Sequence, residues 1–429
     1  MKTIYFTLII TILAFSSNAQ QNLSLQDAIE KALANNYDLI LIKGDQQIAE
    51  INNSWGNAGR YPYISFSLGD NNSATFKPGD NTIANSFSTG LGLNWTIFEG
   101  FAVRISKQRY EELENLSKQN TAIMVENTIQ AVILAYFDVL LQKEKLEVYR
   151  EVMALSEDRY LHEQAKKDFG ASVTYDVLQA QNSYLSDRSD FLRQEVTWKN
   201  SLRNLNYLMT EAGQATYNLT EKFEALPVDY SLSELEARLL ENNKTLLNQY
   251  INQQLLKNAL ASAKSSYMPS VSLSSGLSAT STRSRIGDAD ASWGETASLY
   301  GNITLSLNLF SGGSRKRAVQ IAKIDEELGL VETSQVKHEL TNSLSNLFEY
   351  YLVRKELLEV ARENLEAASL NLQISGEKFE TGAINSFNFR DVQNIYLNAA
   401  VQNLEAIYNF IDTHTSLLRM TGTIIQEYE

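Results

Sequence analysis

Tyr61 to Gly69 reads YPYISFSLG and Tyr267 to Leu277 reads YMPSVSLSSGL, so the chain contains two versions of one short segment. Pro62 and Pro269 stand 207 residues apart, and each is followed by residues that alternate between apolar and small polar. Proline ends a helix, and strict alternation has the period of a β-strand. Each segment therefore predicts a strand that begins where a helix has just ended.

The similarity extends far beyond these two prolines. Gly170-Ala171 corresponds to Gly382-Ala383 at a separation of 212 residues. Self-similarity at a nearly fixed spacing decides the architecture ahead of any single residue. We interpret residues 20–226 as a first structural repeat and residues 227–429 as a second.

Both repeats predict the same order of elements: a helix, a β-hairpin, a very long helix, a glycine turn and a returning helix. Apolar residues at spacings of three and four, such as Val125, Ile129 and Val132, indicate the seams of coiled-coil helices. The hairpin, long helix and returning helix are expected at 61–99, 101–168 and 174–210 in the first repeat, and at 268–310, 313–380 and 386–421 in the second.

The N-terminus predicts an export signal, residues 1–19. Lys2 precedes an apolar run from Ile4 to Phe15, and Ser17-Asn18-Ala19 resembles a cleavage site. No later stretch approaches eighteen consecutive apolar residues, and the chain has no cysteine. The lack of cysteine excludes disulfides, thiolate metal sites and a lipid-modified N-terminal cysteine. We expect a periplasmic protein, a secreted protein or a β-protein of an outer membrane.

Charge and residue types exclude several classes of function. The chain has 37 basic and 51 acidic residues, and this acidic balance argues against a nucleic-acid partner. His162, His338 and His414 stand far apart, and no motif for metal binding, phosphate binding or nucleophilic catalysis accompanies them. The sequence predicts neither an enzyme nor a cofactor or metal site.

The predicted strands suit either a soluble half-buried sheet or a membrane barrel. Their polar face consists of Ser, Thr, Asn and Gly, which favours the barrel. A lipid-facing sheet has to close, and four strands are fewer than the roughly eight of the smallest common barrels, so a membrane protein of this kind must oligomerise. Aromatic residues at the hairpin ends resemble a membrane-interface girdle, although they would also suit a core: Tyr61, Tyr63, Trp95, Phe98, Tyr267 and Phe310.

The order of these motifs resembles the TolC-like outer-membrane factor family over nearly all of the mature chain. The resemblance implies a mainly α protomer with a β-barrel portion, in which four membrane strands and long coiled-coil helices form a trimeric α/β barrel channel. Members receive substrate through a periplasmic adaptor from an inner-membrane pump or ABC exporter. The motifs are LSLQDAIEKALANN (23–36), LNWTIFEGF (93–101), LSLNLFSGGSRKR (305–317), FGASVTYDVLQAQNSY (169–184) and TGAINSFNFRDVQNIY (381–396).

The resemblance also implies a pore constriction after the second turn glycine. The family has carboxylates six and nine residues after that glycine, where this chain has Asn388 and Asp391. Asp391 matches the pattern and Asn388 departs from it. We therefore expect a constriction with half of the usual charge.

A gate is implied at the same end of the molecule. Asp176 matches a family residue that tethers neighbouring helices in the closed state, whereas its expected Tyr and Arg partners are Phe379 and Ile384 in this chain. The usual latch cannot form with these residues. The turns that would dock the adaptor contain Gly170, Ala171, Ser172, Gly382 and Ala383.

Taken together, these features predict a passive exit duct in the outer membrane, with a periplasmic helical extension that contains the gate. It would work as a homotrimer in contact with outer-membrane lipid, in a tripartite efflux pump or a type I secretion system. Drugs, metal ions and secreted proteins all remain open as cargo. The alternative is an exported coiled-coil protein without a channel, either an adhesin or a periplasmic adaptor.

Overall fold

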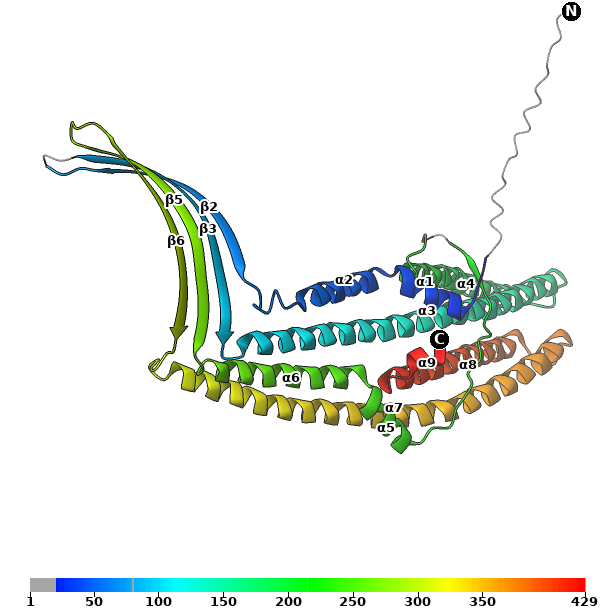
Figure 1. The fold of residues 1–429 in the computed structure, drawn as a ribbon. Helices are drawn as coiled ribbons and strands as arrows, with labels where there is room; N and C mark the ends of the chain where they lie inside the picture. Colours follow the sequence, from blue (N-terminus) through cyan, green and yellow to red (C-terminus); the bar gives the residue numbers. More distant parts are fainter. Residues whose placement is uncertain (1–20, 79–80, 214, 429) are drawn as a thin grey trace, which may run out of the picture. The chain divides into compact units, whose positions relative to one another are not determined.

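The computed structural model describes residues 21–78, 81–213 and 215–428 (Figure 1). The predicted signal peptide lies outside these residues. The chain separates into two compact units. Unit 1 contains the described residues up to Tyr37, Val125–Glu236 and the described residues from Leu344 onward, and unit 2 contains the described parts of Asp38–Met124 and Ala237–Ser343. Each unit takes segments from both halves of the chain, so neither unit corresponds to one sequence repeat.

Unit 2 contains a four-stranded antiparallel sheet in the order β2-β3-β5-β6 (Figure 1). The first hairpin is formed by β2 (Tyr63–Thr75) and β3 (Thr82–Glu99), and the second by β5 (Ser270–Ile286) and β6 (Ser292–Ser306). Pairing between β3 and β5 joins the two hairpins. Within the described chain, the outer edges of β2 and β6 therefore have no neighbouring strand.

The strand register collects apolar side chains on one face of this sheet. The opposite face consists largely of Ser, Thr, Asn and Gly, as the alternation predicts. One apolar row crosses all four strands at Phe66, Leu91, Leu277 and Leu299, whose exposed fractions are 71%, 52%, 53% and 82%. Such a row has no protein core to cover it in the protomer, and this arrangement is typical of strands whose outer face contacts lipid.

The alternation predicted for β3 is interrupted near the C-terminal end of the strand. A β-bulge lies between Thr96 and Phe98, where the pairing with β5 shifts by one residue. A bulge adds one residue to a strand and so reverses the direction of the following side chains. Phe98 consequently lies on the apolar face, whereas simple alternation placed Ile97 there.

The passage from β3 to the following helix depends on Gly100. Its φ is +55°, and a Cβ built there would lie 2.4 Å from the Ser265 carbonyl oxygen and 2.6 Å from Met268 Cβ. We expect Gly100→Ala to destabilise the protein by about 2 kcal/mol or more, because strained backbone and a backbone clash add. Thermal unfolding of the purified protein measures the loss. Gly44→Ala is the matched control, since nothing lies within 4 Å of Gly44; an equal loss there would contradict this role.

Unit 1 is helical and encloses the main hydrophobic core. Val132, Ile133, Tyr136 and Leu205 are fully buried in it. Two long helical hairpins form its frame, and the segments that pair or pack around them are short. The hairpins are α3 (Ala102–Asp168) with α4 (Thr174–Leu208), and α7 (Ser314–Glu380) with α8 (Ser386–Met420).

The shorter segments complete both units. A parallel ladder joins β1 (Gln21–Leu23) to β4 (Tyr217–Leu219) in unit 1. Among the described residues, α3 is the one helix long and apolar enough to cross a membrane, and half of its apolar window is buried within the protein. The remaining helices are α1 (Leu25–Asn35), α2 (Tyr37–Asn52), α5 (Leu232–Asn242), α6 (Lys244–Ser265) and α9 (Ile424–Tyr428).

A half-buried histidine makes the stability of unit 1 sensitive to acid. His414 lies among aromatic rings, and its Nε2 is 3.0 Å from the Tyr230 hydroxyl. Burial lowers the pKa of His414 below its ordinary value of 6.5, and the nearby Glu427 carboxylate opposes this shift only in part. The folded state therefore favours neutral imidazole, while the unfolded state takes up a proton below that value.

We accordingly expect stability to be retained above about pH 6.5 and to fall as the pH drops toward the lowered pKa of the folded state. His414→Phe should give a shallower loss of melting temperature between about pH 7.5 and about pH 5.5. Equal slopes for the two proteins would show that other groups control the acid response.

Candidate functional site at the helical tips

Both helical hairpins of unit 1 reverse direction at a glycine. Gly170 and Gly382 each have φ +75°, the left-handed conformation predicted for these turns. The N–H of Ala171 donates to the Lys166 carbonyl at 2.8 Å, and the N–H of Ala383 donates to the Lys378 carbonyl at 2.8 Å. These hydrogen bonds satisfy carbonyl groups at the helix ends. The two repeats thus produce two nearly identical tips.

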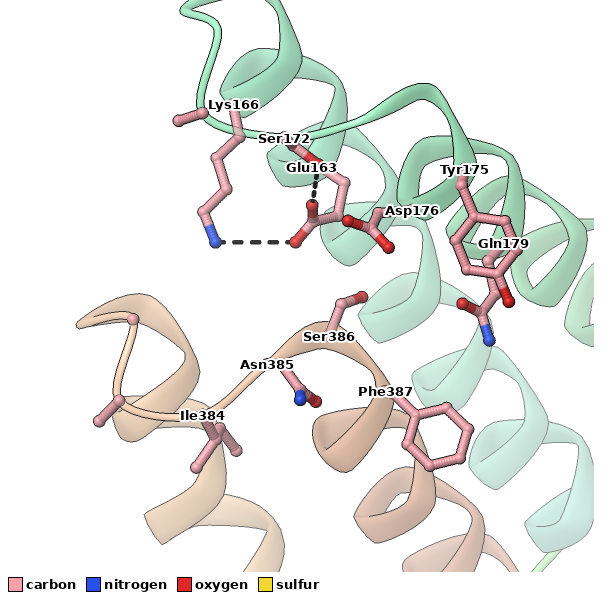
Figure 2. A pocket seen from close by; sticks show the side chains of 13 residues that line it. Glu163, Lys166, Ser172, Tyr175, Asp176, Gln179, Ile384, Asn385, Ser386 and Phe387 are labelled. Carbon is pink, nitrogen blue, oxygen red and sulfur yellow. Dashed lines mark hydrogen bonds and ion pairs between the residues drawn. The ribbon is translucent and has the colours of Figure 1, made fainter.

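A groove of about 660 Å³ lies between the two tips. Asp176 and Ile384, two of the residues predicted to form the gate, both line it on opposite walls, as Figure 2 shows. On the wall formed by the α3–α4 turn, the Glu163 carboxylate accepts a 2.8 Å hydrogen bond from the Ser172 hydroxyl and lies 3.6 Å from Lys166 Nζ. The turn residues predicted to dock an adaptor contribute to the same groove: Ala171, Ser172, Gly382 and Ala383.

Phe379, the third residue predicted for the gate, is only 5% exposed. Its ring stacks on Phe389 with centroids 4.9 Å apart and lies 5.0 Å from the His162 ring. Lys166 Nζ lies 5.2 Å from its centroid. The ring of Phe379 in α7 therefore packs against α8 and against α3 of the other hairpin, where the family pattern expects a polar tether.

A buried ion pair joins the two hairpins next to this aromatic contact. Arg390 in α8 donates to both carboxylate oxygens of Asp187 in α4, at 2.6 and 2.7 Å. The Asp187 side chain is 4% exposed and that of Arg390 19%. Two parallel hydrogen bonds to one carboxylate fix both position and direction. We call Arg390 and Asp187 the interhairpin pair.

A second arginine lies beside the interhairpin pair. Arg159 in α3 is 3% exposed and donates to the Ser386 carbonyl, the first residue of α8, at 3.0 Å. Burial lowers the pKa of Arg159 to about 10, and the adjacent Arg390 contributes to the shift. Arg159 nevertheless remains charged at neutral pH. Its Nε and Nη2 have no hydrogen-bond partner within the described part of the chain, so part of its donor capacity is unused.

Polar contacts continue along the antiparallel α3–α8 seam, away from the tips. The Tyr396 hydroxyl donates to Glu151 at 2.8 Å, and Lys145 Nζ lies 2.7 Å from Glu405. Further along, Gln130 donates to the Ser416 hydroxyl at 3.0 Å. Movement of one hairpin past the other would have to break these contacts in series.

The interhairpin pair was missed by our sequence reasoning. Its partners stand 203 residues apart, and Asp187 lies three residues beyond the motif at 169–184. A usable signal was present, since Ala180, Tyr184 and Asp187 are spaced by four and then three residues, which makes Asp187 a seam position. A carboxylate at such a position is buried and requires a cation.

The predicted constriction residues have a different environment. Asn388 and Asp391 are both exposed on α8, three residues apart and therefore on one side of the helix. Asn385 caps this helix by accepting the Asn388 N–H at 2.8 Å. The carboxylate of Asp391 is thus free to face water or a neighbouring copy, and its role in a pore stays a prediction.

The predicted girdle residues are on the surface of unit 2. Phe98 is half-buried and meets Phe101 edge-on, at 5.3 Å between centroids. Trp95 donates its indole N–H to the Arg60 carbonyl at 2.9 Å. Exposed aromatics do not support the core alternative. The exposed members are Tyr61, Tyr63, Trp95, Tyr267 and Phe310.

No group of three or more His, Asp or Glu side chains that could hold a metal ion occurs within the ranges that the structure describes. The chain has no cysteine to add to such a group.

Characterised relatives share most of the length of this chain. The chain is 22% identical over 376 residues to the cation efflux system protein CusC of Escherichia coli, covering 85% of this chain and 78% of CusC. It is 21% identical over 408 residues to the outer membrane efflux protein BepC of Brucella suis, covering 93% and 85%.

Solved structures of outer-membrane channels have the same fold. A CusC crystal structure covers 93% of this chain and 92% of its own, with a TM-score of 0.75 and 17% identity. The open state of the MtrE outer membrane channel of Neisseria gonorrhoeae covers 93% and 89%, with a TM-score of 0.70 and 15% identity.

A family model described as outer membrane efflux protein matches residues 28–211 and 235–423. These two stretches include most of both sequence repeats. They confirm the predicted resemblance and favour the channel over a coiled-coil protein without one. This chain belongs to the outer membrane efflux protein family.

Proposed function

We propose that three copies of this outer-membrane efflux protein close into one barrel and form the exit duct of a tripartite pump. The observation that carries the proposal is the open sheet, with unpaired edges at β2 and β6 and an exposed apolar face. In a membrane, unpaired strand edges must be satisfied by other strands. Three sheets of four strands would supply twelve, which falls within the range of membrane barrels.

The tips of unit 1 would form the gate at the periplasmic end. The interhairpin pair, the Phe379 stack and the Arg159 contact with Ser386 all connect one hairpin to the other. We propose that these contacts hold the closed state in place of the Asp176 latch, for which Phe379 and Ile384 provide no polar partner. Asp391 and Asn388 would then narrow the pore.

The groove between the tips would receive the helical end of a periplasmic adaptor, which links the duct to an inner-membrane pump or ABC exporter. Its walls combine charged Glu163 and Lys166 with exposed Tyr175 and Phe387. A mixture of aromatic anchors and a charged rim is typical of a protein-binding surface. The cargo would pass along the channel axis rather than bind in this groove.

Introduced cysteines test the closure of the barrel without background, because the natural chain has none. Variants with one cysteine on β2 (Ser65 or Ser67) and one on β6 (Thr296 or Ser298) should form intermolecular disulfides at one of these registers. The expected products run as covalent dimers and trimers in denaturing gels.

The matched control places the cysteines at Ser88 of β3 and Ser298 of β6, strands that are separated by β5. These should not link. Absence of every β2–β6 product in protein that is inserted in membranes would contradict the proposed barrel.

A further inference from the structure

Basic residues gather where the two long helices begin. The segment Phe101–Tyr110 has three basic residues and no acidic one, and Ser311–Ile324 has four and none. Arg104 and Lys316 occupy equivalent positions of the two repeats, 212 residues apart. In a chain with 51 acidic and 37 basic residues, two such segments at equivalent places need an explanation.

Without a bound anion, basic side chains at the start of these two helices are electrostatically unfavourable. Neither α3 nor α7 has an acidic residue in its first turn. The start of a helix bears partial positive charge, so cations there are repelled and anions are attracted. An external anion beside these side chains would remove the repulsion.

The position of the basic residues, directly after an exposed apolar band, indicates where that anion comes from. The apolar side chains of the lipid-facing row continue beyond β6: Leu307, Leu309 and Phe310 are 52%, 87% and 85% exposed. The first charges after them are those of Arg315, Lys316 and Arg317. Figure 1 shows this start of α7 beside the ends of β5 and β6. Charged groups that directly follow an apolar and aromatic band lie at the level of lipid headgroups.

Three of the basic residues have structural partners and are set aside. Arg315 donates to the Ser266 carbonyl at 3.1 Å and lies 5.0 Å from the centroid of the Tyr267 ring, so it positions an aromatic residue of the girdle. Lys107 is paired with Glu111 at 2.6 Å, and Lys323 lies 3.5 Å from Glu327.

The other basic side chains of the cluster face solvent. Arg104, Lys316 and Arg317 are exposed. The guanidinium of Arg317 donates a 3.3 Å hydrogen bond to the Gly312 carbonyl, within its own helix start. Glu99, at the end of β3, is the nearest acidic residue in sequence to Arg104 and is itself exposed.

We propose that Arg104, Lys316 and Arg317 bind the phosphate groups of anionic phospholipids in the periplasmic leaflet of the outer membrane. This inference rests on the proposed barrel, which sets the level of the membrane surface. Lysine and arginine near a membrane surface each strengthen binding to anionic lipid about fivefold. Three such residues in each of three copies would form a basic collar around the base of the barrel.

The test uses the full-length protein purified in detergent and titrated with fluorescent phosphatidylglycerol or phosphatidylcholine. We expect the triple variant Arg104→Gln/Lys316→Gln/Arg317→Gln to lose about tenfold or more in affinity for phosphatidylglycerol and to keep its affinity for phosphatidylcholine. The matched control removes three exposed charges from unit 1, by Lys167→Gln/Arg188→Gln/Lys222→Gln, and should leave both affinities unchanged.

Three results would overturn the inference. The first is a triple variant that prefers phosphatidylglycerol over phosphatidylcholine as strongly as the natural protein does. The second is suppression of phosphatidylglycerol binding to the natural protein by inorganic phosphate to the same extent as by the three substitutions, which would indicate a site for free anions. The third is altered ion selectivity in neutral bilayers without any change in lipid binding, which would place the three side chains in the channel lumen. The β2–β6 cross-link is measured on the same samples, so failure of the collar is distinguished from failure of the barrel.

Discussion

The variant Arg390→Gln is expected to form channels with a severalfold higher conductance than the natural protein. The change removes the cation from Asp187, whose carboxylate remains 4% exposed beside the other hairpin. Removing one partner of a buried ion pair destabilises its surroundings by about 3–5 kcal/mol. Separation of the α7–α8 tip from the α3–α4 tip would reduce this free-energy cost, because it admits water to the Asp187 carboxylate. The same separation would widen the pore. Conductance of single channels in planar bilayers measures the effect.

The surrounding chain offers a matched control. Asp190 and Arg193 also form an ion pair on α4, but Arg193 is 76% exposed and both residues lie on one helix. Exposed pairs contribute little, so Asp190→Asn should leave the conductance unchanged. The double variant Asp187→Leu/Arg390→Met, which replaces both charges with apolar groups, should restore most of the stability. A conductance that stays natural in Arg390→Gln would show that the interhairpin pair does not hold the gate.

The second large effect is expected from Asp391→Ala. In a trimer, Asp391 would supply three exposed carboxylates at the narrowest part of the pore, and carboxylate rings of this kind favour cations. Removing them should lower the cation-to-anion permeability ratio severalfold, toward equality. Asn388→Asp adds three carboxylates one turn away and should raise the ratio. Reversal potentials in a salt gradient measure both changes.

An exposed carboxylate outside the tips provides the comparison for this prediction. Glu224 is exposed in the segment between β4 and α5, and Glu224→Gln removes the same charge per copy. Its permeability ratio should match that of the natural protein. If Asp391→Ala and Glu224→Gln have equal effects, selectivity reflects the total charge of the protein and Asp391 does not line the constriction.

Much of the fold could be predicted because its elements depend on local patterns. The strand faces follow from simple alternation, and the row through Phe66 and Leu299 lies on the apolar side as expected. The bulge at Thr96 could not be predicted, since it depends on how β3 pairs with β5, far away in the sequence. The same limit applies to the two compact units, which combine segments from both repeats.

The candidate site, too, could be predicted from the sequence only in part. The turn conformations at Gly170 and Gly382 follow from residue type and neighbouring sequence, and both are present. The sequence also showed that Phe379 and Ile384 could not form the usual latch. It did not show the interhairpin pair that we propose in place of that latch, because Arg390 and Asp187 meet only once the helices have packed together.

We propose a closed duct whose gate the interhairpin pair holds shut. Planar-bilayer recording of the purified natural protein beside Arg390→Gln tests this most directly. We predict a small, cation-preferring conductance in the natural protein and a severalfold larger one in the variant. Absence of conductance from both proteins, despite insertion in the bilayer, would contradict the claim.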